Sequence, residues 1–287
     1  MDKKLRQLQL TELEILKEID RFCKNNNIAY SLYAGTLIGA VRHKGFIPWD
    51  DDLDICMSRA EYNRFLDLWE KNPPKGYVLQ NKDNSPSFSQ SFSKVRKDHT
   101  TFLQQGETPG DYHTGIFVDV FPIDRIPKGW FARQIFIWRC MRYQLYTREY
   151  APSDNGKIIK LISEILLKTN SSKTRAKKRN KLLSKVTKYN SDSQLSTVAI
   201  ETNCTLRVPL PPTLMDEFVS LEFEGCRFQC MKSWDECLRI KYSDYMQLPP
   251  VEEQTWKHHP QIIDFENNYE NLKIDEETLK QKRNQVE

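Results

Sequence analysis

Hydrophobic residues recur every three or four positions in several stretches of the chain, and this spacing predicts amphipathic helices. The first stretch covers residues 3–24, and its apolar positions are Leu5, Leu8, Leu13, Leu16, Ile19, Phe22 and Cys23. The same spacing predicts helices over residues 59–71, from Trp130 onwards, over 156–168 and 173–188, and through Tyr242.

Short apolar runs bounded by Gly, Pro and Asn predict strands between these helices. We expect them at residues 28–33, around the aspartates at 52–57, and at 77–80, 92–96, 101–103 and 116–121. Residues 219–230 alternate as a hairpin with Gly225 near its turn, and residues 36–42 form a short turn or helix. This order predicts an α+β fold in which a mixed sheet is flanked by helices.

Two sequences of the type Ser-x-x-Glu predict where helices begin, because the serine and the glutamate can cap each other's backbone amides. They are Ser58–Glu61 and Ser233–Glu236.

Four aspartates crowd into five positions, at Asp50, Asp51, Asp52 and Asp54. Packed carboxylates repel one another, so a folded chain needs a cation or strong hydrogen bonds to keep them close. On a strand, Asp52 and Asp54 would share one face and offer two oxygen ligands suited to Mg²⁺ or Mn²⁺. A solvated acidic turn is the alternative, but the strand and the capped helix that follow favour a rigid site.

Asp119 is the best candidate for a third carboxylate, because it is a lone acid in the apolar run Gly115–Phe121. A carboxylate in a buried strand must be paired, protonated or bound to metal. A structural ion pair is therefore the rival interpretation of Asp119. Asp124 follows in the predicted turn 122–125, and we interpret it as a turn or ion-pair residue.

Gly35 and Thr36 precede the aspartates at the position where an enzyme acting on a nucleotide phosphate needs a close backbone approach. Candidate phosphate-binding side chains are Arg42, His43, Lys94 and Arg96, since cationic groups offset phosphate charge. Each of these side chains also has an interpretation as ordinary surface charge. His258 and His259 are candidates for holding metal or substrate.

Composition narrows the class of protein. The 287 residues contain no apolar run long enough to span a bilayer and no apolar segment typical of a secretion signal. Seven scattered cysteines favour reduced thiols and a cytoplasmic protein. A zinc site at Cys226, Cys230 and Cys237 is the weaker alternative to buried thiols.

The charge is unevenly distributed. Between Lys128 and Lys188 lie 16 basic and three acidic residues, a net of +13 in a chain whose total is +4, so the remainder carries −9. Aromatic and aliphatic residues such as Trp130, Phe131 and Ile135 accompany these basic residues, with Phe136, Trp138 and Leu145 further along. The segment 128–188 therefore binds an anionic membrane surface, binds a polyanionic acceptor, or is a solvated helical face.

The stretch Gly35–Ile55, with its sequence Trp-Asp-Asp-Asp-Leu-Asp-Ile, resembles the signature of the LicD family of phosphorylcholine-type transferases, which are related to the fukutin proteins. The resemblance continues in Gly115–Asp124, Phe223–Gly225, Lys241–Pro250 and His258-His259, and it omits the basic middle. Thr36 stands where Gly or Ser is common in nucleotidyltransferases, and Ser243 stands where the family often has Gly.

The resemblance implies a nucleotidyltransferase-like core and transfer of a substituted phosphate from a CDP-activated donor to a sugar hydroxyl. Asp52, Asp54 and Asp119 would take the three-carboxylate catalytic and metal-binding roles, with Mg²⁺ as cofactor and Mn²⁺ as the alternative. CDP-choline is the expected donor, and a lipid-linked glycan or teichoic acid precursor is the expected acceptor. Substrate contacts are expected from Trp49, Tyr112 and His258, because aromatic faces bind a quaternary ammonium.

Three alternatives remain open. The first is a CDP donor that carries ribitol phosphate or glycerol phosphate, and the second is nucleotidyl transfer. The third is a non-catalytic nucleic-acid-binding protein built on the basic helices. The acidic cluster and the lack of a nucleic-acid reader motif argue against the last, so no nucleic acid partner is expected.

We expect three regions along the chain. Residues 1–127 would form the catalytic core, residues 128–212 a basic and mainly helical segment, and residues 213–287 a hairpin and helices that pack back on the core. The expected location is cytoplasmic and peripheral, at the inner face of the membrane.

Overall fold

A computed structural model describes residues 2–104, 112–152, 156–191, 197–199, 209–258 and 260–272. Its central mixed sheet has the strand order β1-β2-β6-β4-β3, formed by Ser31–Leu32, Asp54–Ser58, Phe117–Arg125, Ser93–Lys97 and Tyr77–Gln80. β2 and β6 are parallel, whereas β1 with β2, β4 with β6 and β3 with β4 are antiparallel. The predicted α+β fold with a mixed sheet is confirmed.

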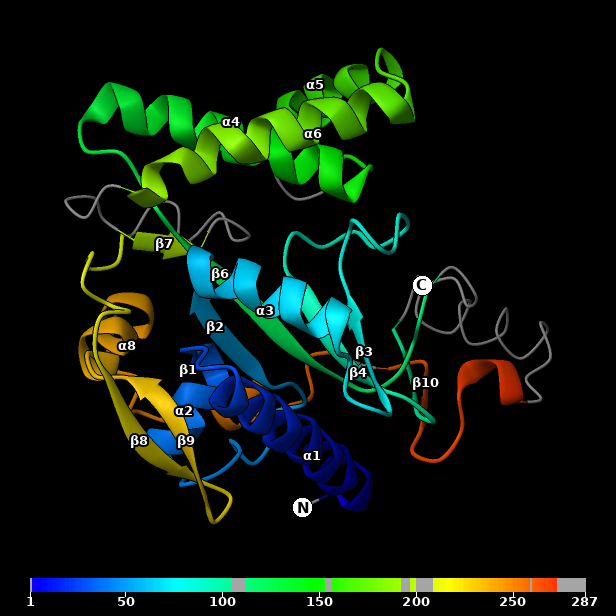
Figure 1. Ribbon diagram of the computed structural model, residues 1–287, viewed down its shortest axis with the longest axis vertical. Coiled ribbons are helices and arrows are strands. Elements are labelled where there is room, and N and C mark those ends of the chain that lie inside the picture. Colours follow the sequence, from blue (N-terminus) through cyan, green and yellow to red (C-terminus); the bar gives the residue numbers. More distant parts are fainter. Residues whose placement is uncertain are drawn as a thin grey trace.

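Helices α1 (Lys3–Asn25) and α3 (Arg59–Lys71) lie next to each other along the sheet (Figure 1). Phe22 of α1 packs against Phe65 and Trp69 of α3, with ring centroids 5.7 and 4.7 Å apart. The apolar stripe predicted for each helix is the side that enters this core.

The two predicted capping boxes differ in outcome. The Ser58 side chain accepts a hydrogen bond from the Glu61 amide at 3.3 Å, so α3 begins where the sequence predicts. Ser233 precedes α8 (Trp234–Tyr242) but makes no side-chain cap, so that capping box is wrong. The Ser233 backbone has ψ of 33°, away from the extended conformation that an N-cap serine usually adopts.

Two strands differ in length from the sequence prediction. The strand predicted at 28–33 is reduced to β1, because Tyr33 already precedes helix α2 (Ala34–Arg42). The strand predicted at 116–121 continues to Arg125 as β6, because β7 (Thr197–Ala199) pairs with its end. Asp124 therefore lies in a strand and not in a turn.

The C-terminal region packs back on β1. The predicted hairpin is β8 (Phe218–Phe223) with β9 (Cys226–Met231), and the Met231 amide donates to Ser31 Oγ at 2.9 Å. Cys230 and Cys237 lie in the hydrophobic core. Further along, β10 (Ile262–Asp264) pairs with β5 (Thr101–Leu103), and the single-turn helices η2 (Val251–Glu253) and η3 (Tyr269–Asn271) flank this strand.

Three helices form a separate group at one end of the molecule (Figure 1). They are α4 (Trp130–Arg148), α5 (Lys157–Lys168) and α6 (Ser172–Thr187), followed by η1 (Lys188–Ser191). This group has its own small core, in which Phe136 and Cys140 of α4 are buried together with Leu182 and Val186 of α6. No helix in the described ranges is both long enough and apolar enough to cross a membrane.

Candidate active site

Three charged residues lie in a row across neighbouring strands. In the sheet register Asp54 of β2 pairs with Asp119 of β6, and Asp119 pairs with Lys94 of β4. Directly paired residues project from the same face of a sheet, so these side chains share one face. Lys94 Nζ lies 2.6 Å from Asp119 Oδ1, and both side chains are buried. The ion-pair interpretation of Asp119 is confirmed, and the same register places Asp119 beside Asp54.

Helix α2 fixes the start of β2. Thr36 Oγ1 accepts a hydrogen bond from the Asp54 amide at 2.8 Å, and the Tyr33 amide donates to the Asp54 carbonyl oxygen at 3.0 Å. Thr36 is therefore a structural partner of the aspartate segment.

Gly35 lies in the first turn of α2, against Asp50. A Cβ at this position would lie 2.7 Å from Asp50 Oδ2, closer than real contacts allow. A glycine here lets a helix N-terminus, which favours anions, approach the acidic segment closely.

Asp52 lies before β2 and not within it, so the prediction that Asp52 and Asp54 alternate along one strand is wrong. The segment around Asp50 is held instead by helix α1, because Gln9 Nε2 donates to the Asp50 carbonyl oxygen at 2.9 Å. Asp52 is still close enough for its charge to act on Asp54.

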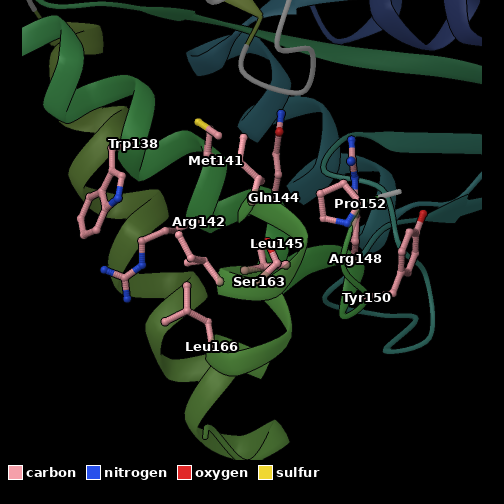
Figure 2. Close-up of a pocket in the computed structure, with 12 residues that line it drawn as sticks. Trp138, Met141, Arg142, Gln144, Leu145, Arg148, Tyr150, Pro152, Ser163 and Leu166 are labelled. Carbon is pink, nitrogen blue, oxygen red and sulfur yellow. The ribbon is translucent and has the colours of Figure 1, made fainter. Parts of the chain in front are cut away.

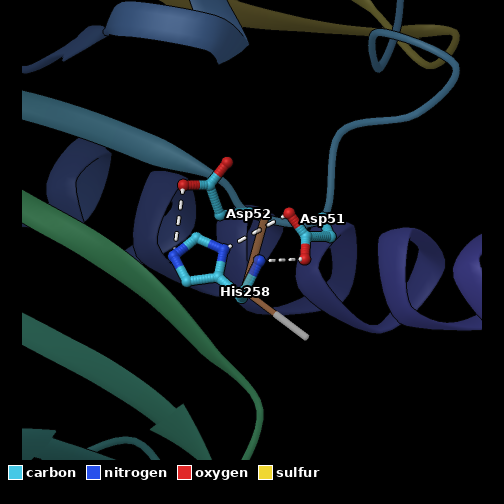
Figure 3. Close-up of side chains that lie close together, drawn as sticks. All are labelled: Asp51, Asp52 and His258. Atoms are coloured by element: carbon cyan, nitrogen blue, oxygen red, sulfur yellow. Dashed lines mark hydrogen bonds and ion pairs between the residues drawn. The ribbon is translucent and has the colours of Figure 1, made fainter. Parts of the chain in front are cut away.

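Asp51, Asp52 and His258 meet at one point (Figure 3). Asp51 accepts hydrogen bonds from the backbone amides of Lys257 and His258 at 3.1 and 2.9 Å. The His258 ring lies between the two aspartates, with Nδ1 3.3 Å from Asp51 Oδ1 and Nε2 3.9 Å from Asp52 Oδ2. The expectation that His258 belongs to the site stays a prediction, and this geometry supports it. His259 lies outside the described residues.

Burial and like charges raise the pKa of most carboxyls in this cluster. The pKa of Asp50 rises to about 8, mainly through burial and then through Asp52. Burial, Asp52 and Asp119 hold the pKa of Asp54 well above its usual range. Burial also raises the pKa of Asp52, and the neighbouring His258 opposes that rise. These groups are costly to ionise together unless positive charge is nearby.

The pKa values of Asp51 and His258 both shift in the direction that favours the charged form, because the two side chains are partners. Burial would raise the pKa of Asp51, but the hydrogen bonds from His258 and Lys257 outweigh it and lower the pKa. Burial would lower the pKa of His258, but the hydrogen bond to Asp51 and the charge of Asp52 raise it.

Glu12 is a further buried carboxyl that the sequence did not single out. Its side chain comes from α1, it is 1% exposed, and its Oε2 has no hydrogen-bond partner within the described part of the chain. Burial, followed by the charges of Asp52, Asp51, Asp50 and Asp119, holds its pKa well above the usual range. It stands on the apolar stripe of α1, four residues after Leu8 and four before Leu16, so a charge at a stripe position is the signal that could have identified it.

This donor set fits a divalent cation. Carboxylate oxygens and one imidazole converge, and an unpartnered buried carboxyl lies close enough to feel their charge. Hard oxygen donors favour Mg²⁺ or Mn²⁺. Of the residues described, Asp51, Asp52 and His258 are the set of three whose ligand atoms all lie within 4.8 Å of one another. The assignment of Asp52, Asp54 and Asp119 as the ligands stays a prediction.

The predicted phosphate-binding side chains lie in different surroundings. Arg42 Nη1 donates to the Tyr245 carbonyl oxygen at 2.7 Å and Arg42 Nε to the His43 ring at 2.8 Å, and Asp50 is close enough to affect the pKa of Arg42. Arg96 is buried, and it donates to Gln80 Oε1 and to the Gly115 carbonyl oxygen at 2.6 and 2.7 Å.

Lys241 of α8 was missed as a site residue, although it belongs to the motif Lys241–Pro250. Its Nζ lies 3.8 Å from the centroid of the Tyr33 ring, and its charge acts on Asp54. It is therefore a third cation, with Lys94 and Arg42, close to the acidic cluster.

The two aromatic residues expected at the substrate have different neighbours. Trp49 is partly buried beside His43, with ring centroids 6.5 Å apart, and it directly precedes Asp50. Tyr112 lies beside Arg96 and Phe88.

A mixed sheet that presents carboxylates from adjacent strands next to a helix N-terminus is typical of enzymes that act on nucleotide phosphates. Residues 27–149 match the family described as LicD/FKTN/FKRP, nucleotidyltransferase domain.

Similarity to a known protein extends along nearly the whole chain. The chain is 31% identical, over 264 residues, to the lipopolysaccharide cholinephosphotransferase LicD of Haemophilus influenzae; the match covers 88% of this chain and 96% of that protein. An uncharacterised protein of Rickettsia prowazekii is 27% identical over 146 residues, about half of each chain (50% and 51%). The chain belongs to the LicD family and is a transferase.

Proposed function

We propose that the protein transfers phosphocholine from CDP-choline to a sugar hydroxyl of a cell-surface glycan precursor. One observation carries this proposal: the chain is 31% identical to a protein named as a lipopolysaccharide cholinephosphotransferase, and the match covers 96% of that protein. The acceptor would be a lipid-linked or teichoic acid-like glycan, and the protein would act at the cytoplasmic face of the membrane. The basic residues of 128–188 would contact anionic lipids there.

The acidic cluster suits the diphosphate of such a donor. Asp52, Asp54 and Asp119 would hold Mg²⁺, which would offset the diphosphate charge when bound. Lys94, Arg42 and Lys241 would add positive charge, and the N-terminus of α2 at Gly35 would point amides towards the phosphates. Trp49 and Tyr112 would offer aromatic faces to the choline group, which has no hydrogen-bond donor.

The bonds change in one displacement. The acceptor oxygen would bond to the phosphorus that carries choline, and the bond between that phosphorus and the bridging oxygen would break, so that CMP leaves. Asp119 would either accept the hydroxyl proton or complete the metal site. Its ion pair with Lys94 holds this carboxylate in place beside Asp54.

The test follows CMP release and choline incorporation with CDP-choline, Mg²⁺ and extracted lipid-linked glycan. We expect metal-dependent transfer that falls at least about 100-fold in Asp54→Asn and in Asp52→Asn, because each variant removes a ligand charge. Asp67→Asn, which changes an exposed aspartate on α3, is the matched control and should keep normal activity.

The outcome also decides the donor. Activity with CDP-ribitol or CDP-glycerol and none with CDP-choline would retain the mechanism and overturn the choline assignment. Pyrophosphate release from a nucleoside triphosphate would instead identify nucleotidyl transfer. Near-normal transfer by Asp54→Asn in excess Mg²⁺ would overturn the proposed mechanism.

A further inference from the structure

Large apolar side chains are exposed together on helices α4 and α5. On α4 they include Trp130, Phe131 and Trp138, and on α5 they include Ile158, Leu161 and Ile165. Phe131 is 79% exposed and Ile158 is 75% exposed. We call this region the α4–α5 surface. Exposure of several large apolar side chains on neighbouring helices marks an interaction site.

Helix α5 presents its apolar side outwards. Ile158, Leu161 and Ile165 recur at helical spacing on one stripe, and all three are at least 50% exposed. Ser163 is the one buried residue of α5. A helix that serves only to complete a core would bury that stripe, so α5 is built to contact something else.

A groove of about 240 Å³ runs between the two helices (Figure 2). Met141 and Leu145 of α4 face Ile159, Ile162 and Leu166 of α5 across it. Its mainly apolar walls suit a hydrocarbon chain.

Two guanidinium groups flank this groove. Arg142 and Arg148 line it, and neither forms an ion pair within the part of the chain that the structure describes. The Arg142 guanidinium stacks on Trp138, with its central carbon 4.5 Å from the ring centroid, and its buried Nε has no hydrogen-bond partner among the described residues. Arg142 Nη2 also donates to Tyr146 Oη at 3.2 Å. An apolar groove bordered by two guanidinium groups that have no ion-pair partner among the described residues is complementary to a hydrocarbon chain attached to a phosphate.

The surrounding charge favours the same ligand. Lys157, Lys160 and Lys168 are exposed on α5 next to its apolar stripe. A polyanionic glycan or a nucleic acid would use the basic residues but would leave the apolar stripe in water. An anionic bilayer uses both, because interfacial helices bury an apolar side below the headgroups and place Lys and Arg among the phosphates.

We propose that the α4–α5 surface enters the headgroup region of the cytoplasmic leaflet of an anionic phospholipid bilayer, and that the groove takes one lipid chain whose phosphate binds Arg142 and Arg148. This inference deepens the proposed function, since it rests on an acceptor that is held in a membrane. It assigns insertion to α5 and to the exposed side of α4, and not to α6, which supplies seven basic residues in 16 positions but no large exposed apolar side chain.

The first test is flotation of the full-length protein with vesicles of phosphatidylcholine alone and of phosphatidylcholine with phosphatidylglycerol. We expect binding to the second kind only. Ile158→Glu should weaken that binding at least about tenfold, because it removes buried apolar area and adds a negative charge at the interface. Val251→Glu is the matched control: Val251 is 79% exposed, lies outside the helical group, and should leave binding unchanged.

The second test concerns the groove. Arg142→Gln and Arg148→Gln should each weaken vesicle binding roughly fivefold. Lys181→Gln on α6 removes the same charge and should have a smaller effect. Phospholipids brominated on their chains should quench the fluorescence of Trp138, measured as the difference between the unaltered protein and Trp138→Phe. Circular dichroism confirms that each variant is folded.

Several results would overturn the proposal. Equal effects of Lys181→Gln and Arg142→Gln would show general charge attraction and no phosphate site at the groove. Absence of vesicle binding, with a dimer in sedimentation that Ile158→Glu dissociates, would make this surface a contact between two copies of the chain. CMP release with a water-soluble glycan acceptor does not depend on vesicles, so it separates failure of this inference from failure of the proposed transfer.

Discussion

At the scale of single residues, the candidate site combines side chains from distant parts of the chain. Asp54 and Asp119 meet because β2 and β6 are parallel neighbours. Glu12 and Lys241 join them from α1 and α8, about 40 residues before and about 190 residues after the acidic run. Asp54 and Asp119 stand in apolar runs and Glu12 stands on the apolar stripe of α1, so each carries a local signal, whereas Lys241 does not.

His258 provides a prediction at this scale. It lies between Asp51 and Asp52, so His258→Gln should loosen the position of both carboxylates. We expect a fall of about 10- to 100-fold in transfer, together with weaker apparent affinity for Mg²⁺. A Mg²⁺ titration of the reaction measures both effects.

His99→Gln is the control for that experiment, since the His99 side chain is 76% exposed. An unchanged Mg²⁺ dependence in His258→Gln would show that the imidazole does not position the carboxylates.

At the scale of elements, backbone geometry explains one departure from the family pattern. Ser243 ends α8 with φ of 54° and ψ of −116°, a conformation that favours glycine. The family often has Gly at this position, and the Ser243 amide still donates to the Arg239 carbonyl oxygen at 2.9 Å. The serine therefore adopts a backbone conformation that is strained for a residue with a Cβ.

Ser243→Gly should therefore stabilise the protein by about 1 kcal/mol, because it relieves a strained conformation of the kind that costs about 1–3 kcal/mol. Urea unfolding measures the change. Ser220→Gly in strand β8 is the matched control and should destabilise by roughly 0.5–1 kcal/mol, because glycine in a strand loses more entropy on folding. Destabilisation by both substitutions would argue against strain at Ser243.

At the scale of the whole molecule, a buried ion pair links three parts of the fold. Asp124 of β6 binds Arg59 of α3 through two hydrogen bonds of 2.8 and 2.5 Å, and Asp124 is fully buried. Asn190 of η1 donates to the same carboxylate at 2.8 Å and accepts from the Arg125 amide, also at 2.8 Å. The connection between the sheet and the helical group therefore passes through Asp124.

Asp124→Asn should lower the free energy of unfolding by about 3 kcal/mol, because it leaves the Arg59 charge buried without a counter-charge. Urea unfolding followed by circular dichroism measures the loss. Asp67→Asn, which breaks an exposed ion pair with Lys71, should change stability by less than about 1 kcal/mol. A loss in Asp124→Asn as small as in the control would show that the hydrogen bonds, and not the charge, hold this connection.

The local elements and the class of chemistry can be predicted from the sequence alone. Periodicity identified α1, α3 and α4, and apolar runs identified most strands, because these patterns record which side of each element is buried. The aspartates at 50–54 and the lone acid at 119 were sufficient to predict an acidic site, since carboxylates in apolar surroundings need a charged partner.

Only the tertiary structure decided which of those residues meet. Pairing of β6 with β7 turned a predicted turn at Asp124 into a strand, and packing of α1 beneath the acidic segment brought Glu12 to it. Tertiary contacts also decide burial in the basic segment. Phe136 and Leu145 of α4 are buried there, whereas Ile158, Leu161 and Ile165 of α5 are exposed. Which side of an amphipathic helix faces water depends on its neighbours, and those contacts join residues far apart in the sequence.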